Sequence, residues 1–284
     1  MSAPPPISTP SYLLTPNHTF CAIAAEKLES GMNERPLVSC LMVSRGDVSI
    51  LQYALQCYLD QDYPNRELIL VTSHPSTGLE RLIARYPAAQ IKLIPASPGL
   101  SIGELRNISL AHAGGSLVCT WDDDDLSDPQ RLSVSVRVLL AGNAPAFFLM
   151  RCLIWWPARR LFALSTWRAW ENTMVAVREV MPSYPPVSRL EDTFVMDAIR
   201  QDRSVAVIEV PYLYCYTVTG NNTCGEEHFK DHLDLAHTVI QGDGYEKGLA
   251  RLAKRMPIRE YAAELERRSF FARETKTACA ELDA

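Results

Sequence analysis

The chain has 284 residues, of which 47% are hydrophobic and 21% charged, the balance of an ordinary globular protein with room for one large α/β domain or two small ones. Its formal net charge of −5 gives a nucleic-acid-binding role little support. Its 8 cysteines include no CxxC pair, which indicates free buried thiols in a reducing, cytoplasmic compartment rather than a secreted disulfide framework.

The hydropathy pattern predicts no membrane span. No segment approaches the run of about 18 uncharged apolar residues that a transmembrane helix needs, and the start, MSAPPPISTP, lacks the basic and apolar regions of a signal peptide. The most apolar stretch, 144–156, contains Pro145 and Arg151, which favours a buried strand. Peripheral contact with the inner face of the membrane stays open.

The first 35 residues differ in character from the rest of the chain. Residues 1–35 are rich in proline and serine and then carry a short helical pattern at 22–28, so we expect an N-terminal extension outside the core. A buried strand is predicted from Leu37, because LVSCLMV is a continuous apolar run. Apolar residues then recur at helical spacing over 50–59, with Asp47 as a candidate N-cap.

Strands and helices continue to alternate up to an acidic run. Apolar segments at 67–72, 91–94 and 117–121 predict three more strands. Helical spacing at 79–86 and an S-x-x-E capping box opening 101–111 place helices between them. Such alternation is typical of βαβ units, so we expect an α/β fold with a mixed, mostly parallel sheet flanked by helices. Ligands of such sheets bind at the carboxyl ends of the strands.

After the acidic run the pattern is less regular. Asp128 and Pro129 suit the N-cap and first position of a helix that ends near Gly142. The later segments are predicted as strands within 146–177, a helix from residue 191, a strand at 205–210 and a largely helical remainder from residue 226.

The acidic run itself, WDDDDLSDP, carries the first functional signal. Four adjacent carboxylates repel one another, and Mg²⁺ and Mn²⁺ prefer such oxygen ligands and also bridge to substrate phosphates. In an extended segment Asp122 and Asp124 point the same way and can face one ligand together. A solvated acidic turn is the simpler alternative. A calcium EF-hand is excluded, because Ser127 and Ser133 occupy its required Gly and Glu positions.

Further motifs lie on both sides of this run. The chain contains, in order, VSCLMVS, QDYPNRELILV, GLSIGELRNISLAHAGGSLVCTWDDDDLSDPQRL, RLEDTFV and GNNTCGEEHF. The third is similar, almost residue for residue, to the G-x-x-x-A-R-N … D-x-D-D … P-x-x-L segment of family 2 glycosyltransferases, and the others resemble that family's strand, acceptor-site and C-terminal motifs. The resemblance implies a Rossmann-like GT-A domain over 36–229, with a helical region at 230–284 packed on it.

The resemblance also implies roles for the residues of the DXD motif. Asp124 would be the direct ligand of Mn²⁺ or Mg²⁺ at the donor diphosphate. Asp122, with Asp123 beside it, would lie near the nucleotide ribose or the metal. Arg106 would lie near the donor, although a structural salt bridge from Arg106 to the acidic run is an equal alternative.

Two departures from the family pattern bear on the donor. The family's T-Y-N-R after the first strand reads S-R-G-D here, and its Asp after the second strand is replaced within T-S-H. Ser44, Arg45 and Ser73 therefore stand at nucleotide-sugar-binding positions without the family's usual side chains. A UDP-sugar is the favoured donor, and dTDP and GDP remain open.

The remaining candidates concern the base and the metal shell. Inverting transfer needs a carboxylate to take the acceptor proton, and the resemblance points to Asp192 with Glu191 beside it. Both also suit a helix start for structural reasons. His228 would complete the metal shell, while its spacing from His232, H-x-x-x-H, is common by chance and lacks the Glu of a zinc protease.

Together these features predict a metal-dependent inverting hexosyltransferase. It would move a sugar from a nucleoside diphosphate to the hydroxyl of a saccharide or glycoconjugate, as in polysaccharide biosynthesis, the family's commonest setting. The alternatives are a catalytically degenerate nucleotide-sugar sensor or scaffold and a sugar-nucleotide pyrophosphorylase, whose Gly-rich basic signature is missing. Most tryptophans are expected in the core, with one or two free to line an acceptor cleft.

Overall fold

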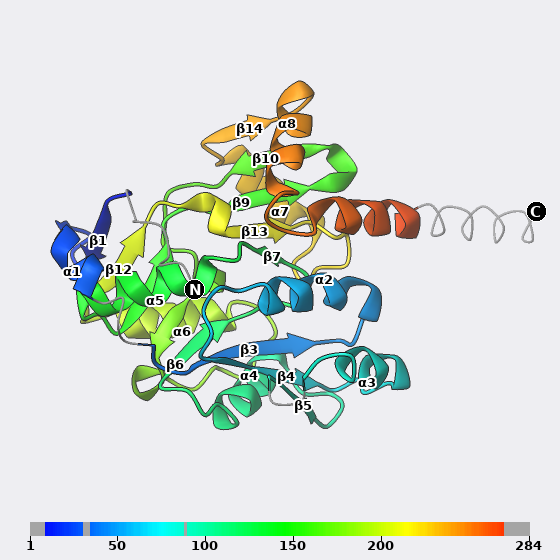
Figure 1. The fold of residues 1–284 in the computed structure, drawn as a ribbon, viewed down its shortest axis with the longest axis horizontal. Coiled ribbons are helices and arrows are strands. Elements are labelled where there is room, and N and C mark those ends of the chain that lie inside the picture. Colours follow the sequence, from blue (N-terminus) through cyan, green and yellow to red (C-terminus); the bar gives the residue numbers. More distant parts are fainter. Residues whose placement is uncertain (1–8, 31–34, 88–89, 270–284) are drawn as a thin grey trace, which may run out of the picture.

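The computed structural model describes residues 9–30, 35–87 and 90–269, which form two β-sheets with helices packed around them (Figure 1). The larger sheet has the strand order β2-β1-β12-β8-β11-β6-β3-β4-β5, and the smaller one β14-β10-β9-β13-β7. In the larger sheet β1 and β11 run against the other strands. The predicted mixed, mostly parallel α/β architecture is therefore confirmed.

The parallel half of the larger sheet consists of β6 (Leu117–Thr120), β3 (Val38–Ser44), β4 (Arg66–Thr72) and β5 (Ile91–Pro95). Alternate side chains of β3 enter different cores, with Cys40 and Met42 in one and Leu41 in the other. Burial on both faces explains why these strands are continuous apolar runs. Their carboxyl ends lie along one edge of the sheet, which is where the acidic run begins.

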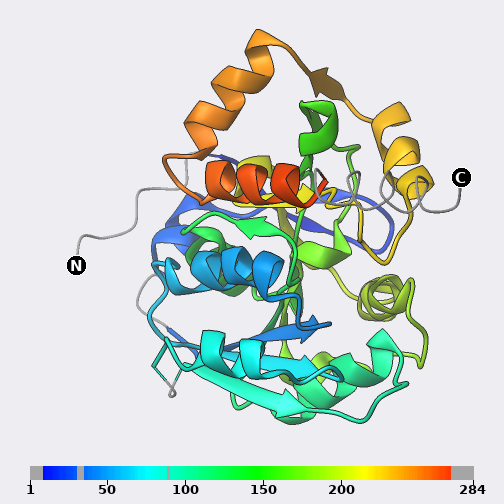
Figure 2. The same cartoon turned by 90° about the vertical axis from the view of Figure 1, so that its right-hand side faces the viewer.

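Helices cover both faces of this sheet (Figure 2). Buried side chains place α2 (Val48–Leu59), α3 (Thr77–Ile83) and α5 (Arg131–Gly142) on one face. The other face is covered by α4 (Ile102–Ala111) and α6 (Glu191–Arg200). This arrangement puts α4 and α6 on the same side of the sheet.

The predicted helix starts agree with the structure to different degrees. The capping box of α4 is confirmed, with reciprocal bonds between Ser101 and Glu104. Asp47 stands at the N-cap position of α2, but its side chain caps nothing and accepts instead from the Ser49 hydroxyl. The predicted start of α5 was too early, because Asp128 accepts from the Gln130 amide and pairs with Arg255, so that Gln130 stands at the N-cap.

The mixed half of the larger sheet includes part of the predicted N-terminal extension. It is built from β11 (Val175–Val177), β8 (Ala146–Leu149), β12 (Val205–Ile208), β1 (Ser11–Leu14) and β2 (Phe20–Ala22). Residues 11–22 were expected outside the core, yet β1 pairs along its length with β12 and buries Leu14. The segment SYLL is too short, and its apolar pattern too weak, to predict a strand without knowledge of its partner.

The smaller sheet is joined to the larger one through the acidic run. It contains β7 (Leu126–Ser127), β13 (Tyr214–Thr217), β9 (Leu153–Trp156), β10 (Leu161–Leu164) and β14 (Thr238–Ile240). The chain leaves β6 at Thr120, crosses over residues 121–125 and enters β7, which pairs with β13. Each end of the acidic run is thus held by a different sheet.

The C-terminal part is helical, as expected, apart from β14. It comprises α7 (Glu226–Asp234), α8 (Asp243–Leu252) and a helix at 258–269. Tyr261 of this last helix stacks on Tyr53 of α2, with ring centroids 4.8 Å apart. The short elements that complete the chain are α1 (Ala25–Ser30), η1 (Pro157–Arg159), η2 (Glu171–Thr173), η3 (Arg178–Val180) and η4 (Pro211–Leu213).

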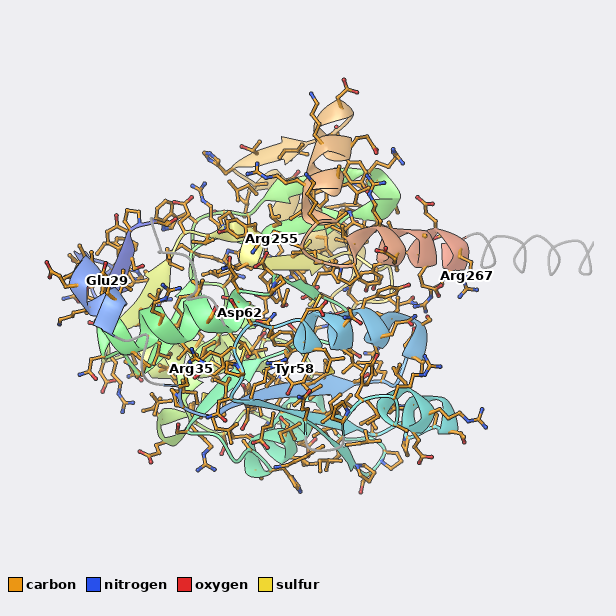
Figure 3. All side chains as sticks on the ribbon, viewed as in Figure 1. Glu29, Arg35, Tyr58, Asp62, Arg255 and Arg267 are labelled. Carbon is orange, nitrogen blue, oxygen red and sulfur yellow. The ribbon has the colours of Figure 1, made fainter. Side chains whose placement is uncertain are left out.

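The core is dense in aromatic and sulfur-containing side chains. Tyr58, labelled in Figure 3, packs edge-on against Trp121. Among the tryptophans Trp167 is 48% exposed and the others are buried, and the free thiols expected in the strands, among them Cys40 and Cys119, are also buried. Within the residues described, no helix combines the length and apolar composition that crossing a bilayer requires.

Candidate active site

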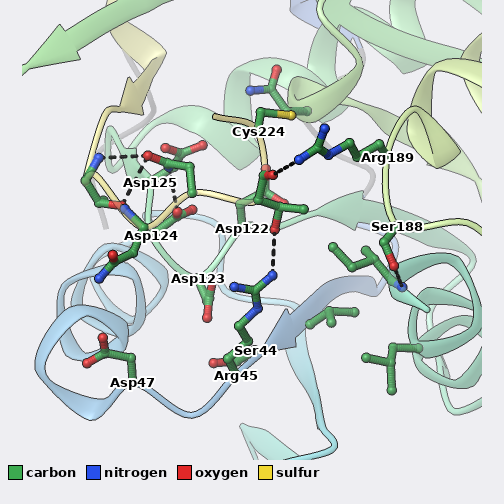
Figure 4. A pocket seen from close by; sticks show the side chains of 18 of the residues that line it. Ser44, Arg45, Asp47, Asp122, Asp123, Asp124, Asp125, Ser188, Arg189 and Cys224 are labelled. Carbon is green, nitrogen blue, oxygen red and sulfur yellow. Dashed lines mark hydrogen bonds between the residues drawn. The ribbon is translucent and has the colours of Figure 1, made fainter. Parts of the chain in front are cut away.

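A cleft of about 560 Å³ opens at the carboxyl edge of the parallel strands (Figure 4). Its walls come from segments far apart in the sequence, namely the ends of β3, β4 and β6, the start of α6 and the segment 219–224. The cleft brings together most of the residues predicted to form the site: Ser44, Arg45, Ser73, Arg106, Asp122, Asp123, Asp124, Glu191 and Asp192.

The four carboxylates of the acidic run have different surroundings. Asp122 accepts a hydrogen bond from Arg106 at 3.1 Å and another from the Tyr214 hydroxyl at 2.9 Å. Asp125 is turned into the core, where it accepts from the Tyr214 hydroxyl and from the Thr217 amide at 2.7 Å. Asp125 therefore anchors the crossing to β13, although it also borders the cleft.

Asp123 and Asp124 face the cleft, and their negative charges are offset less than those of the other two aspartates. Burial raises the pKa of Asp123 to about 6, despite the opposing effect of a hydrogen bond from Ser44. Burial, and then repulsion from the neighbouring aspartates, raises the pKa of Asp124 well above its usual range. The partner of the Asp124 carboxylate is a neutral amide, Nδ2 of Asn222 at 2.8 Å. This pair of carboxylates is the part of the run that most lacks positive charge.

Arg106 connects the acidic run to the second acidic pair. Its guanidinium donates to Asp122 and, also at 3.1 Å, to Glu191 at the start of α6. Burial would lower the pKa of Arg106, but the carboxylates and Tyr184 outweigh it and keep the residue charged. The structural salt bridge considered from the sequence is present, and it fixes α6 relative to β6.

A close contact between α4 and the loop before α6 supports this connection. Gly103 of α4 donates its backbone N–H to the Val187 carbonyl at 2.9 Å. A Cβ at Gly103 would lie 1.8 Å from the Pro185 carbonyl oxygen, so only glycine fits there. The loop that carries the start of α6 is thereby held against the helix that carries Arg106.

Asp192 differs from its neighbour Glu191 because no cation binds its carboxylate directly. Its Oδ1 accepts from the backbone N–H of Thr193 at 2.8 Å, and the side chain lines the cleft. Burial raises the pKa of Asp192 to about 7, against the opposing effect of Arg106. A carboxylate with such a pKa can take up and release a proton near neutrality.

The sequence comparisons agree with this site. Residues 39–151 match the sequence model of the Glycosyl transferase family 2. The chain carries a family 2 glycosyltransferase segment. EpsE of Bacillus subtilis (strain 168), a glycosyltransferase by name, is 34% identical over 111 residues, which cover 38% of this chain and 40% of EpsE. The family 2 segment includes the predicted donor and metal residues up to the acidic run, and it ends before Glu191 and Asp192.

Comparison with solved structures shows a GT-A fold. The S. aureus TarS structure of residues 1–349 is 14% identical, with a TM-score of 0.50, and the match covers 69% of each chain. The same TarS region in complex with UDP-GlcNAc gives a TM-score of 0.52 at 14% identity, covering 71% of this chain and 61% of that one.

The ends of β3 and β4 form the wall that the family pattern assigns to the donor. Ser44, Arg45 and Ser73 all line the cleft there. Gly46 follows with a φ of +77°, and a Cβ on it would approach the His74 carbonyl oxygen to 2.9 Å. Glycine therefore allows the two strand ends to approach closely enough to make one wall.

The opposite wall contains residues that the sequence did not single out. Arg45 Nη2 donates to the Thr223 hydroxyl at 3.3 Å, and Arg189 Nη2 donates to the Thr223 carbonyl at 3.0 Å. Asn222 bonds Asp124 and is itself held by the Thr219 amide. The motif GNNTC drew attention only through the histidine that follows it, although its own polar side chains are the ones that reach the cleft.

Arg268 was missed entirely. It comes from the helix at 258–269, lines the cleft and pairs with Asp47 at 2.7 Å. An arginine in a charged helix carries no sequence signal of this role, because its ion-pair partner Asp47 lies more than two hundred residues away in the chain.

His228 lies apart from the other predicted metal ligands. It is not among the residues that line the cleft, and its Nε2 is 3.1 Å from Nε2 of His232. Burial lowers the pKa of both histidines, that of His232 to about 4. The two imidazoles therefore face each other as neutral rings, packed near Trp170 and Phe229.

The donor set fits a divalent cation that a substrate also binds. In the described part of the chain no three His, Cys, Asp or Glu side chains are arranged to hold a metal by themselves. Mg²⁺-type sites in phosphate-transferring enzymes use one or two carboxylates and take the remaining ligands from phosphates and water. Asp124, whose charge no cation offsets directly, and Asp122 two residues before it provide the one or two carboxylates that such a site needs.

Proposed function

We propose that the protein transfers a sugar, with inversion, from a nucleoside diphosphate to the hydroxyl of a saccharide or glycoconjugate acceptor. The observation that carries this proposal is the arrangement around Arg106. One guanidinium binds both Asp122 and Glu191, so the acidic run and Asp192 face a single cleft in a fixed relation. A glycosyl transfer needs these two acidic groups, one for the leaving diphosphate and one for the attacking hydroxyl.

The donor is proposed to be a UDP-sugar. TarS, which shares the fold, has been solved with UDP and with UDP-GlcNAc. In this chain Ser44, Arg45 and Ser73 line the corresponding edge of the sheet, and Arg189 adds a second cation on the facing wall. Guanidinium groups suit a diphosphate because they offer paired donors in one plane.

A divalent cation, Mn²⁺ or Mg²⁺, is proposed to be held by Asp124 and Asp122. When bound with the diphosphate, such an ion supplies the positive charge that stabilises the leaving group. Asp122 is pre-oriented for this role by Arg106 and Tyr214. The Asn222 amide, which now donates to Asp124, would be displaced or would turn toward the diphosphate.

Asp192 is proposed to be the general base. It takes the proton of the acceptor hydroxyl as that oxygen bonds to the anomeric carbon and the bond from carbon to diphosphate oxygen breaks on the opposite face. Glu191 positions it, because its bond to Arg106 fixes the first turn of α6. The activity would serve polysaccharide or glycoconjugate assembly at the cytoplasmic side of the membrane.

The test is a panel of UDP-, dTDP- and GDP-sugars, assayed for binding and slow hydrolysis with Mn²⁺ and with EDTA. We expect one donor to bind and turn over only with the metal. Binding without turnover, even when saccharide acceptors are supplied, would favour the sensor or scaffold. Folded protein that binds no nucleotide sugar would overturn both.

A further inference from the structure

One polar side chain that lines the cleft takes part in neither the proposed metal site nor the proposed base catalysis. Asn172 lies on η2 and lines the cleft together with Asp122 and Asp192. Only 8% of its surface is exposed, and its carboxamide oxygen is buried without a hydrogen-bond partner. Buried polar groups are almost always paired, and an unpaired one costs free energy, so this oxygen calls for an explanation.

The backbone around Asn172 is held in place, which excludes a loosely placed loop as that explanation. Arg131, itself buried, donates through Nη2 to the carbonyls of both Thr120 and Asn172. Thr173 Oγ1 accepts from the Leu149 amide at 3.0 Å, and Glu171 accepts from the Thr193 hydroxyl at 2.9 Å. The backbone that carries Asn172 is therefore a fixed support at the wall of the cleft, while the carboxamide oxygen itself is covered in the free protein.

The same contacts connect Asn172 to both acidic groups. Through Arg131 it is tied to the end of β6, two residues before Asp122. Through Glu171 and Thr193 it is tied to the first turn of α6, which carries Asp192. Because the diphosphate belongs with the acidic run and the attacking hydroxyl with Asp192, the group between them is the sugar being transferred.

We propose that Asn172 determines sugar specificity: its carboxamide, which no side-chain hydrogen bond holds, turns toward the cleft so that its oxygen accepts a hydrogen bond from a hydroxyl of the transferred sugar. This inference rests on the proposed function. It assigns the orphaned oxygen the partner it lacks, and a site built to bond a hydroxyl rejects analogues without it. The free energy lost by leaving the oxygen unpaired in the free protein is regained when the donor binds.

Asn107 provides a matched control. Its carboxamide is also partly buried, but it donates to the Tyr184 carbonyl and accepts from the Tyr184 amide, both at 2.8 Å. Asn107→Ala removes a satisfied structural pair, whereas Asn172→Ala removes a group with no partner to lose. The two substitutions delete the same atoms and should separate binding from stability.

The experiment measures the binding of UDP and of the nucleotide sugar that the wild type selects from the donor panel, together with the melting temperature. We expect Asn172→Ala and Asn172→Leu to weaken nucleotide-sugar binding by about tenfold and to leave UDP binding unchanged. The melting temperature should hold or rise for Asn172→Ala and fall for Asn107→Ala.

Several results would overturn the inference. These are unchanged nucleotide-sugar binding in both Asn172 variants, an equal loss for UDP alone, an effect confined to the KM of the acceptor, or a loss of stability as large as that of Asn107→Ala. If the wild type binds no nucleotide sugar, the proposed function falls with it. If the wild type binds and the variants match it, only the role of Asn172 is wrong.

Discussion

The two acidic groups of the cleft are built alike but differ in the positive charge that offsets their carboxylates. In each, one carboxylate is bonded to Arg106, namely Asp122 in the acidic run and Glu191 at the start of α6. In each group a second carboxylate faces the cleft and has a raised pKa, namely Asp124 in the acidic run and Asp192 at the start of α6. Burial is the largest cause for both, but Asp124 is also surrounded by three neighbouring aspartates.

This difference separates a cation site from a proton site. Repulsion within the acidic run is relieved by a cation that several carboxylates share. Three carboxylates also raise the pKa of Asp192, but Arg106 opposes them, and at a pKa of about 7 the group can exchange a proton with an acceptor. One arginine thus supports two acidic groups with different chemistry.

The largest effect is expected from Asp124→Asn. This change removes the charge that would bind the metal, and metal-dependent turnover should fall by roughly 10³-fold. Asp47→Asn is the control, because Asp47 lines the same cleft but already pairs with Arg268. Initial rates at several Mn²⁺ concentrations measure both variants, and an Asp124→Asn enzyme with wild-type rates would remove Asp124 from the metal site.

Asp192→Asn should reduce transfer by roughly 10²- to 10³-fold while donor affinity stays within a few-fold of the wild type, because only the base is lost. Asp197→Asn, on the exposed side of the same helix, should leave both unchanged. Single-turnover rates and donor titrations measure the two properties. Loss of donor binding in Asp192→Asn would show a structural role instead.

Arg106→Met tests the connection between the two groups. Removing the guanidinium leaves two carboxylates without their cation, one of them, Glu191, buried, and should lower the free energy of unfolding by ~3–5 kcal/mol. Arg81→Met on the exposed surface of α3 is the control and should change it little. Urea titrations give both values, and similar stabilities would mean that Arg106 does not hold the site together.

The pH dependence of transfer should follow Asp192. Because the base must be ionised, the rate should fall about tenfold for each pH unit below about 7 and level off above it. The residual rate of Asp192→Asn should lack this step. A wild-type profile that is flat between pH 5 and 8, measured with chemistry as the slow step, would contradict the assignment.

The same group predicts the smallest effect, on stability. The pKa of Asp192 is raised in the folded protein, so between pH ~4 and about 7 the folded state binds more protons than the unfolded one. The free energy of unfolding should therefore decrease as pH rises through this window, by more in the wild type than in Asp192→Asn. Urea titrations across the range would detect the difference, and parallel curves would argue against the raised pKa.

The parallel half of the sheet and its site residues were well predicted from local sequence. The runs LVSCLMV and ELILVT are apolar at most of their buried positions, and the capping box at Ser101 is complete within four positions. Strand β1 and the start of α5 were misjudged, because each depends on a distant partner, Val205–Ile208 for the first and Arg255 for the second.

For the active site, local sequence showed which carboxylates were available but not how each is used. The sequence singled out Asp122 and Asp124 within the acidic run, but it did not show that Tyr214 and Thr217 bind Asp125 in the core. His228 matched a motif, but the fold turns its imidazole toward His232. Hydrogen-bond partners of this kind come from segments that meet only after the sheets have assembled.

The sequence by itself determined the strand and helix pattern, the position of the acidic run at a strand end, and the family to which residues 39–151 belong. These follow from periodicity and from residues adjacent in the chain. Tertiary structure alone decided that Arg106 joins the two acidic groups, that Arg268 reaches the cleft, and that Asn172 on the wall of the cleft keeps a buried, unpaired oxygen. Burial and pairing depend on contacts between distant segments, and those contacts set the charge and the hydrogen bonds of the site.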